Sequence, residues 1–202
     1  MILMALIAQA SAVEAERAFA AQAQRGQWAA FRAFAAVEAI MFEPQPVRAH
    51  DYLAKLEEPA TPIRWQPAES YVSCDGSFAA NTGPWQGADG SAGYFSTIWS
   101  NTGGDWKWIV DGGDALGTPR PIPAEPKVER ASCERAPVMN MPMAPAGMEQ
   151  GGGTSRDRSL LWQWQVKPDG ARTFTVRLWN GQRYRTVIED RIAAAAAPKP
   201  TP

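Results

Sequence analysis

The stretch "DWKWIVDGGD", residues 105–114, decides how the rest of the sequence is interpreted. Its alternating tryptophans and its end at an acid and two glycines are typical of a β-strand that runs into a turn. Successive side chains of a regular strand point to opposite faces, so Trp106 and Trp108 share one face, which we expect to be the core. Asp111 then lies on the opposite face with Lys107. We interpret Asp111 as a solvated or interface acid, with a catalytic carboxylate as the alternative hypothesis.

Three strand-like segments precede this stretch and are linked to it by tight turns. Asp75-Gly76 is a strong signal for a two-residue hairpin, because both positions must accept a positive φ. Further turns are predicted at residues 88–90 and 103–104. Four consecutive strands joined in this way form an antiparallel meander. The expected strands are residues 63–74, 77–86, 93–101 and 106–111.

The sequence before these strands has a helical pattern. Apolar residues recur at helical spacing over residues 13–34, and Gly26 divides them into two helices. A short strand at residues 39–42 follows, and then a third helix at residues 49–57 that a proline ends. The predicted fold class is therefore α+β: a curved antiparallel sheet with the helices on its concave side.

Residues 13–114 form the predicted main domain. A smaller unit follows it. Residues 115–158 are rich in proline, methionine and glycine and lack apolar periodicity, so they predict a linker that lies over the surface or is disordered. Residues 159–192 alternate apolar and polar residues between turn signals and predict a three-stranded β meander. A meander of about thirty residues cannot bury one apolar face alone, so it must dock on the main domain or on a partner. Residues 193–202 are interpreted as a flexible tail.

The charge pattern excludes several classes of function. The formal net charge is −1 over 202 residues and the basic residues are scattered, so we expect no nucleic-acid partner. The sequence has no phosphate-binding glycine loop, no Ser-His-Asp arrangement and no zinc-type spacing, so we expect no cofactor. No apolar run is long enough to span a bilayer.

The first twelve residues, MILMALIAQASA, are apolar and end in a small-residue triplet that signal peptidases accept. The usual basic segment before the apolar run is missing. Residues 1–12 are therefore either the remnant of a signal peptide or the apolar start of the first helix. We expect export, with the periplasm as the compartment and the cytoplasm as the alternative. Cys74 and Cys133 would form a disulfide in an exported chain and would be buried thiols in the cytosol.

In this order of elements the chain resembles the SnoaL-like branch of the nuclear-transport-factor-2-like superfamily, specifically its bacterial members of unknown function. The segments that carry the resemblance are ERAFAAQAQRGQWAAF, AIMFEPQPV, GYFSTIWS and GGDWKWIVDGGD. They lie within residues 13–114, about half of the chain. The resemblance implies a cone, in which the sheet curls around the helices and leaves an apolar cavity at its open end.

The resemblance also bears on catalysis. The superfamily includes ketosteroid isomerases, polyketide cyclases and dehydratases, in which acids or histidines inside the cone transfer protons, as well as many proteins without known activity. Many relatives have histidines on the last strand, in a pattern like WKIVHDH. This chain has Val110 and Gly112 at the matching positions, so histidine chemistry on that strand is not expected. Fold alone does not decide the function.

Glu69 and Tyr71 are candidate catalytic groups because they share a strand face with Trp65. If that face looks inward, Glu69 is a buried acid beside aromatic rings, which is an environment that raises the pKa of a carboxyl group. The opposite register, with Val72 and Cys74 inside, is the alternative.

Tyr94 and His50 are the other two candidates. Tyr94 could donate a hydrogen bond to a ligand oxygen, although a tyrosine in a half-buried strand more often packs. His50 is the only histidine and stands next to Asp51. Adjacent helical residues do not face each other, so we interpret His50 as a surface or helix-terminus residue and not as a general base.

Aromatic residues indicate a ligand pocket. Five tryptophans would wall a cavity for a flat or greasy ligand, with filling of the core as the alternative: Trp28, Trp65, Trp85, Trp99 and Trp108. The run MNMPM offers three thioethers at a spacing that would suit Cu(I), with a low-complexity linker as the alternative. Its methionines are Met139, Met141 and Met143.

Three hypotheses about function follow. The first is a protein with an aromatic-lined pocket for a small apolar ligand and no assignable catalysis. The second is an enzyme of the isomerase or dehydratase type that uses a pocket acid such as Glu69, with Tyr71 or Tyr94. The third is a structural or interaction module that forms a homodimer, the oligomeric state we expect. An ionisable side chain at the base of an open cavity would favour the enzyme, and a filled cone would favour the module.

Overall fold

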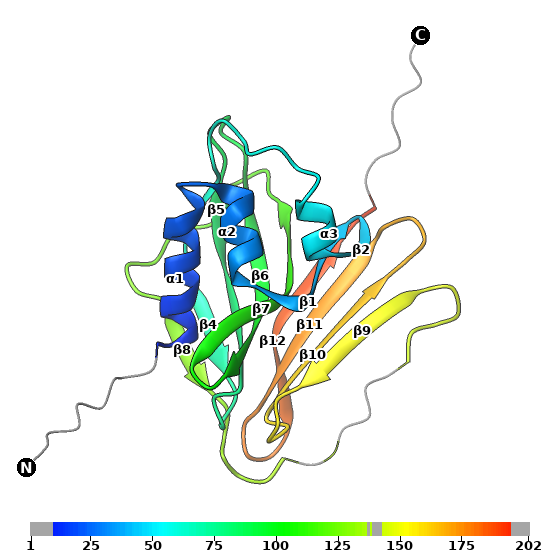
Figure 1. Cartoon of the computed structure of the whole chain (residues 1–202). Helices are drawn as coiled ribbons and strands as arrows, with labels where there is room; N and C mark the ends of the chain where they lie inside the picture. The colour runs from blue at the N-terminus through cyan, green and yellow to red at the C-terminus, as the bar shows by residue number, and fades with distance from the viewer. Residues whose placement is uncertain (1–9, 137, 139–142, 195–202) are drawn as a thin grey trace, which may run out of the picture.

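The computed structural model describes residues 10–136, 138 and 143–194. This part of the chain forms short helices and two β-sheets, so the predicted α+β class is confirmed. A large, curved, mixed sheet carries the helices on one side, and a four-stranded antiparallel sheet lies on its other side (Figure 1).

Helix α1 (Ala12–Ala23) begins with a capping box. The Ser11 hydroxyl accepts a hydrogen bond from the backbone N–H of Glu14, and the Glu14 carboxylate accepts one from the backbone N–H of Ser11. This arrangement satisfies two of the backbone N–H groups that the start of a helix leaves free. Gly26 then separates α1 from α2 (Gln27–Phe34), as predicted.

Helix α3 (Ala49–Leu53) is shorter than the predicted helix 49–57. The segment after it turns toward the start of α2, where Glu58 accepts hydrogen bonds from the backbone N–H groups of Trp28 and Ala29 at 2.9 and 2.8 Å. Residues that could have continued α3 instead cap α2.

The large sheet has the strand order β2-β1-β7-β6-β5-β4-β8, and β3 also pairs with β5. The predicted meander forms its centre, because β4, β5, β6 and β7 are antiparallel neighbours. The predicted strand 63–74 is split into β3 and β4 around Pro67, which has no N–H for the ladder. The strands are β1 (Ala35–Glu43), β2 (Gln45–Arg48), β3 (Arg64–Trp65), β4 (Glu69–Val72), β5 (Phe78–Gln86), β6 (Ala92–Thr102), β7 (Asp105–Ala115) and β8 (Lys127–Arg130).

The second sheet has the order β12-β11-β10-β9, one strand more than the predicted meander. Its strands are β9 (Glu149–Thr154), β10 (Leu160–Val166), β11 (Arg172–Trp179) and β12 (Tyr184–Ile192). β9 reads EQGGGT and has no apolar alternation that could have predicted it. The indole rings of Trp164 and Trp162 cover Gly151 and Gly153, where a Cβ atom would come within 2.5 and 2.8 Å of the rings. Glycine therefore makes room for aromatic packing on this strand.

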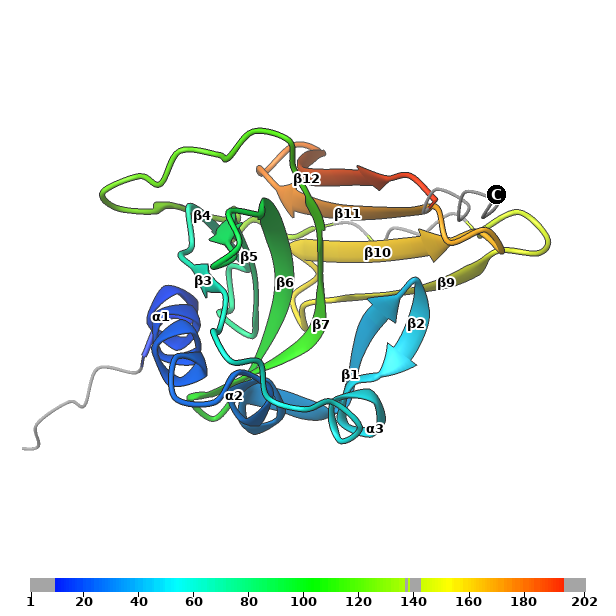
Figure 2. The same cartoon turned by 90° about the horizontal axis from the view of Figure 1, so that it is seen from above.

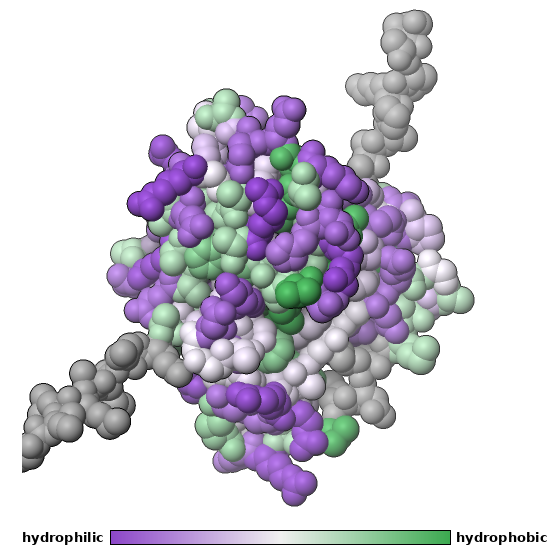
Figure 3. Space-filling model, in the orientation of Figure 1, coloured by the Kyte–Doolittle hydropathy of each residue, from purple (hydrophilic) through white to green (hydrophobic). Residues whose placement is uncertain are grey.

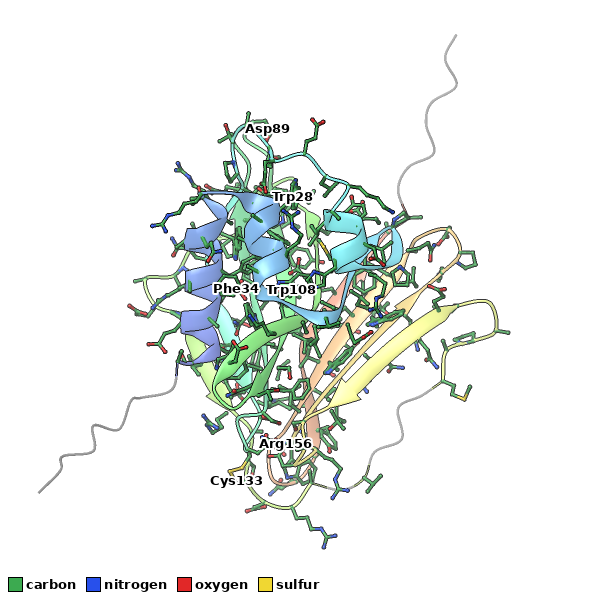
Figure 4. All side chains as sticks on the ribbon, viewed as in Figure 1. Trp28, Phe34, Asp89, Trp108, Cys133 and Arg156 are labelled. Atoms are coloured by element: carbon green, nitrogen blue, oxygen red, sulfur yellow. A yellow bond between two sulfur atoms is a disulfide. The ribbon has the colours of Figure 1, made fainter. Side chains whose placement is uncertain are left out.

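The prediction that residues 115–158 are only a linker is wrong for two parts of the segment, β8 and β9. β8 pairs in parallel with β4 in the large sheet. Just after β8, Cys133 forms a disulfide with Cys74, which follows β4. Cys133 and Arg156 lie at the same end of the molecule (Figure 4), where the Arg156 guanidinium is 3.8 Å from the carboxylate of Asp75. This end of the molecule therefore joins the two sheets.

The large sheet separates two apolar cores. In Figure 2 the helices lie on the concave side of the sheet, and β10, β11 and β12 lie on the other side. Trp99 and Trp108 are fully buried on the helix side. Ile98 and Val110 are buried against the second sheet, which therefore docks on the main domain of the same chain.

The face that carries α1 and α2 shows apolar residues in small groups among hydrophilic ones (Figure 3). Within the described residues, none of the helices has the length and apolar character needed to cross a membrane. A single chain does not test the expected homodimer, which stays a prediction.

Candidate functional site

A cavity of about 370 Å³ lies between the helices and the concave side of the large sheet. Its wall is mostly aromatic. Of the five tryptophans predicted to wall a pocket, Trp28, Trp65 and Trp85 do so, whereas Trp99 and Trp108 are fully buried core residues. In Figure 4, Trp28 is labelled near the upper end of α2, and Phe34 and Trp108 are labelled below it. Further aromatic lining comes from Phe19, Phe31, Phe42 and Phe95.

Glu16 lines this cavity and is a carboxyl group that the sequence analysis missed. It lies on the inner side of α1 and is 0% exposed. Oε1 accepts a hydrogen bond from the indole N–H of Trp65 at 2.8 Å, and Oε2 accepts one from the indole N–H of Trp99 at 2.7 Å. The Asn81 amide also donates to Oε2 at 3.2 Å. A signal was present, because Glu16 interrupts the apolar row of α1 before Phe19.

Each of these groups around the Glu16 carboxyl is a hydrogen-bond donor. The amide of Asn81 is fixed in its orientation because it also donates to the backbone carbonyl of Ala12 at 2.9 Å. Burial raises the pKa of Glu16, and the three hydrogen bonds oppose that rise. In the part of the chain that the structure describes, no Lys or Arg forms an ion pair with Glu16. The donors thus suit a carboxylate whose charge has no cation beside it.

Asp111 also lies inside the cone, which corrects the prediction made from strand alternation. In the register of β6 and β7, Ile109 has no partner residue, because its neighbours Trp108 and Val110 pair with successive residues of β6. One extra residue in a strand reverses the alternation beyond it. Trp108 and Asp111 therefore both face the helices, while Val110 faces the second sheet.

The surroundings of Asp111 leave it able to exchange protons. The Thr97 hydroxyl donates to its Oδ1 at 2.6 Å, and Oδ2 has no hydrogen-bond partner among the described residues. Asp111 lies deep in the cone, and its remaining accessible surface borders the cavity. Burial raises the pKa of Asp111 to about 7; the charge of Glu16 also raises it, while the Thr97 hydrogen bond opposes the rise. A carboxyl group that titrates near neutral pH can act as either a general acid or a general base.

Charged groups from both sheets stand at the rim of the cavity. Glu43 at the end of β1 is exposed, and Asp114 and Arg172 are half-buried. Arg172 belongs to β11 and donates to the backbone carbonyl of Gly113 at 2.7 Å. Its guanidinium also lies 5.3 Å from the centre of the Phe42 ring. The second sheet thus completes one side of the cavity.

Glu69 and Tyr71 lie on the convex face of the large sheet, outside the cavity. The Tyr71 hydroxyl donates to the Glu69 carboxylate at 2.6 Å, and Tyr71 packs in the core between the sheets. Val72 on the same strand faces the helices. Val72 thus lies inside, as in the alternative register, but Cys74 packs against the core between the sheets. Glu69 is not the acid inside the cone.

Tyr94 borders the cavity, but its ring lies 4.1 Å below the guanidinium carbon of Arg120, on the side of the second sheet. Burial raises the pKa of Tyr94 to about 12, and the carboxylates of Asp190 and Asp114 contribute to the rise. A phenol with such a pKa stays protonated at neutral pH. His50 lies in the first turn of α3 and is not among the residues that line the cavity.

The predicted copper ligands fall mostly outside the part of the chain that the structure describes. Met139 and Met141 lie outside the described residues, and Met143 is 85% exposed. Among the described residues, no three His, Cys, Asp or Glu side chains are grouped so that they could hold a metal ion.

The comparisons with known proteins assign no family to the chain. No protein-family model matches the sequence, and no curated protein matches it. Among solved structures, the chain is similar to a protein from Kribbella flavida DSM 17836 described as a "putative ketosteroid isomerase". The two chains are 18% identical, with a TM-score of 0.35, over 56% of this chain and 87% of the other. A likeness of this extent transfers no residue roles, so the site is interpreted from its own geometry.

Proposed function

We propose that the cavity binds a small, flat, largely apolar molecule and that Asp111 transfers a proton to or from it, as in isomerases and dehydratases. One observation carries this proposal: a carboxyl group with a raised pKa, and with one oxygen unpartnered among the described residues, borders an open aromatic cavity. The aromatic walls supply the affinity for a flat ligand. The second hypothesis from the sequence is thus favoured, with Asp111 in the place of Glu69.

The chemistry follows from the surroundings of Asp111. Ionised Asp111 can take a proton from a carbon next to a carbonyl group, and the apolar walls keep it poorly hydrated and therefore basic. In an isomerisation the protonated carboxyl then returns the proton to a different carbon of the ligand. In a dehydration the proton goes to the hydroxyl group that leaves as water. Glu16 has both oxygens engaged, so it acts on this step through its charge on Asp111.

A neutral, flat probe tests the proposal without knowledge of the natural ligand. A base removes the C3 proton of 5-nitrobenzisoxazole, the ring N–O bond breaks, and the coloured cyanophenolate forms. We expect the protein to accelerate this reaction, with a rate that rises with pH through about 7 as Asp111 ionises. Asp111→Asn should abolish the acceleration.

The matched control is Glu69→Gln, which removes a carboxylate on the convex side of the sheet and should leave the rate unchanged. An equal rate in the wild type and in Asp111→Asn would show that Asp111 is not a base in this cavity. If the probe then still quenched tryptophan fluorescence in both proteins, the function would be reduced to binding, the first hypothesis from the sequence. Absence of both binding and reaction would overturn the whole proposal.

We also propose that the protein is exported to an oxidising compartment. The disulfide between Cys74 and Cys133 supports this, because such bonds persist outside the reducing cytosol. Thiol titration of protein purified from its native compartment, with and without reductant, tests it. Two free thiols before reduction would refute both the bond in that compartment and the argument for export.

A further inference from the structure

The carboxyl groups of the cavity outnumber its cations. Four of its lining residues are acids and one, Arg172, is basic. Arg172 is held at the rim by the carbonyl of Gly113 and the ring of Phe42. It also lies close enough to Asp114 and Asp190 for their charges to act on it. At the rim Arg172 offsets part of the acidic charge, while the two interior acids have no cation beside them. The four acids are Glu16, Glu43, Asp111 and Asp114.

The two interior carboxyl groups, Glu16 and Asp111, lack cationic partners. Within the described parts of the chain, neither forms an ion pair, and the charge that acts on Asp111 is the like charge of Glu16. Burial of a carboxylate without a cation is costly, and most proteins avoid it. Here the indole and amide donors around Glu16 stabilise its ionised form, although an apolar side chain could have filled the same space.

The remaining wall presents aromatic rings, whose faces attract cations. Trp28, Trp65 and Trp85 border the cavity together with four phenylalanines. A cation over the face of an aromatic ring gains about 0.5–2 kcal/mol, with tryptophan the strongest, and the gain increases away from water. Aromatic faces next to an unpaired carboxylate are the combination that holds substituted ammonium groups.

We propose, on the basis of the function above, that the ligand of the cavity is an organic cation: a substituted ammonium group beside Asp111, with an apolar body against the aromatic rings. The ammonium group supplies the positive charge that the interior lacks. Oδ2 of Asp111 is the acceptor that it meets. The apolar body occupies the space between the tryptophans and α1.

This inference predicts that binding releases protons. Because the pKa of free Asp111 is about 7, a substantial fraction of the carboxyl is protonated at neutral pH. A bound cation favours the ionised form and lowers that pKa. Affinity for the cation should therefore rise with pH and level off above pH 8, while affinity for a neutral ligand of the same shape should not.

Two ligands of nearly equal shape, one charged and one neutral, show how much the positive charge contributes to binding. Phenyltrimethylammonium and tert-butylbenzene differ in that a charged nitrogen replaces a carbon, and binding of each can be followed by calorimetry or tryptophan fluorescence. At pH 8.5 we expect the cation to bind at least about tenfold more tightly than the neutral molecule, because 1.4 kcal/mol corresponds to a factor of ten. At pH 5.5 this preference should shrink. 4-tert-Butylbenzoate should bind more weakly than both.

Variants assign the preference to Asp111. Asp111→Asn should remove the preference for the cation and keep the binding of tert-butylbenzene, which also shows that the variant is folded. Asp89→Asn removes the same charge at the exposed turn between β5 and β6 (Figure 4), outside the residues that line the cavity, and should keep the preference.

Equal or tighter binding of tert-butylbenzene at pH 8.5 would overturn the inference, as would tighter binding of the benzoate, which would make Arg172 the charged partner. In either case, proton abstraction from 5-nitrobenzisoxazole would keep the proposed function intact. If none of these molecules bound and the benzisoxazole stayed unreacted, the proposed function would fall together with the inference.

Discussion

The two faces of the large sheet are made by the same strands and are filled differently. On the convex face, Ile98, Leu160 and Val176 are fully buried, and the gap near Arg172 and Asp190 is only about 10 Å³. On the concave face, a cavity of about 370 Å³ stays open and contains carboxyl groups. Protein interiors are normally close-packed, so the convex face shows how well this chain can fill space. The close packing between the sheets thus contrasts with the open space between the helices and the concave face.

Truncation of one isoleucine on each face should give the largest difference. Ile98→Ala removes a fully buried side chain between the sheets and should lower the free energy of unfolding by about 4 kcal/mol. Ile63→Ala removes the same atoms from the half-exposed wall of the cavity and should cost about 1 kcal/mol. Urea unfolding of both variants measures this. Equal costs would mean that the concave side is as tightly packed as the convex side.

Asp111→Asn should show how much the ionised carboxylate in the cavity lowers the free energy of unfolding. The pKa of Asp111 is about 7 in the folded chain, above that of an unfolded aspartate, so the folded state binds the proton more tightly. The wild type therefore loses stability as the pH rises from about 4 to about 7. The variant has no such loss and should be more stable at pH 8 by about 4 kcal/mol, with little difference near pH 4.

Thermal or urea unfolding of both proteins at each pH checks this prediction. The wild type serves as its own control at low pH, where its Asp111 is protonated. A variant that is less stable than the wild type at pH 8 would show that the ionised carboxylate is favourable in its site.

Glu16→Gln should produce a smaller change in the titration of Asp111. It should also cost about 1–3 kcal/mol of stability, because the new NH2 group faces a buried donor that loses its acceptor. The charge of Glu16 is one of the causes that raise the pKa of Asp111, after burial, so its removal should lower that pKa. Carbon NMR of the Asp111 carboxyl over a pH series follows the change directly. An unchanged titration would mean that the two carboxyl groups do not interact.

His50→Gln should have the smallest effect. His50 is half-buried on α3, and it is not among the residues that border the cavity, so stability should stay within about 0.5 kcal/mol of the wild type. The rate with 5-nitrobenzisoxazole should also be unchanged. A large loss of this rate would place the histidine in the chemistry after all.

The sequence predicted the main elements of the fold, because alternation and turn residues are local signals. The strands β5, β6 and β10 follow from these patterns. A hairpin does join β4 and β5 at Asp75-Gly76, but only Gly76 has a positive φ and the connection is longer than the predicted two residues. β8 and β9 were missed for physical reasons. β8 is a four-residue strand within a proline-rich segment, and β9 depends on glycines that accommodate rings from the next strand.

The candidate site was harder to predict because its acids depend on pairing between segments. The bulge at Ile109 appears only when β7 is aligned with β6, and it moves Asp111 from the predicted outer face to the inner one. Glu16 could have been found as an acid within an apolar helical row. Its indole partners, Trp65 and Trp99, come from strands far along the chain, so their convergence on one carboxylate is a tertiary feature.

The disulfide between Cys74 and Cys133 spans 59 positions of the chain and encloses β5, β6, β7 and β8. The connection between β7 and β8 is exposed, for example at Ala124. Elastase cleavage after Ala124 would divide the backbone between the two cysteines, yet both fragments would stay covalently attached. On a denaturing gel the nicked protein would migrate as one band without reductant and as two bands with it.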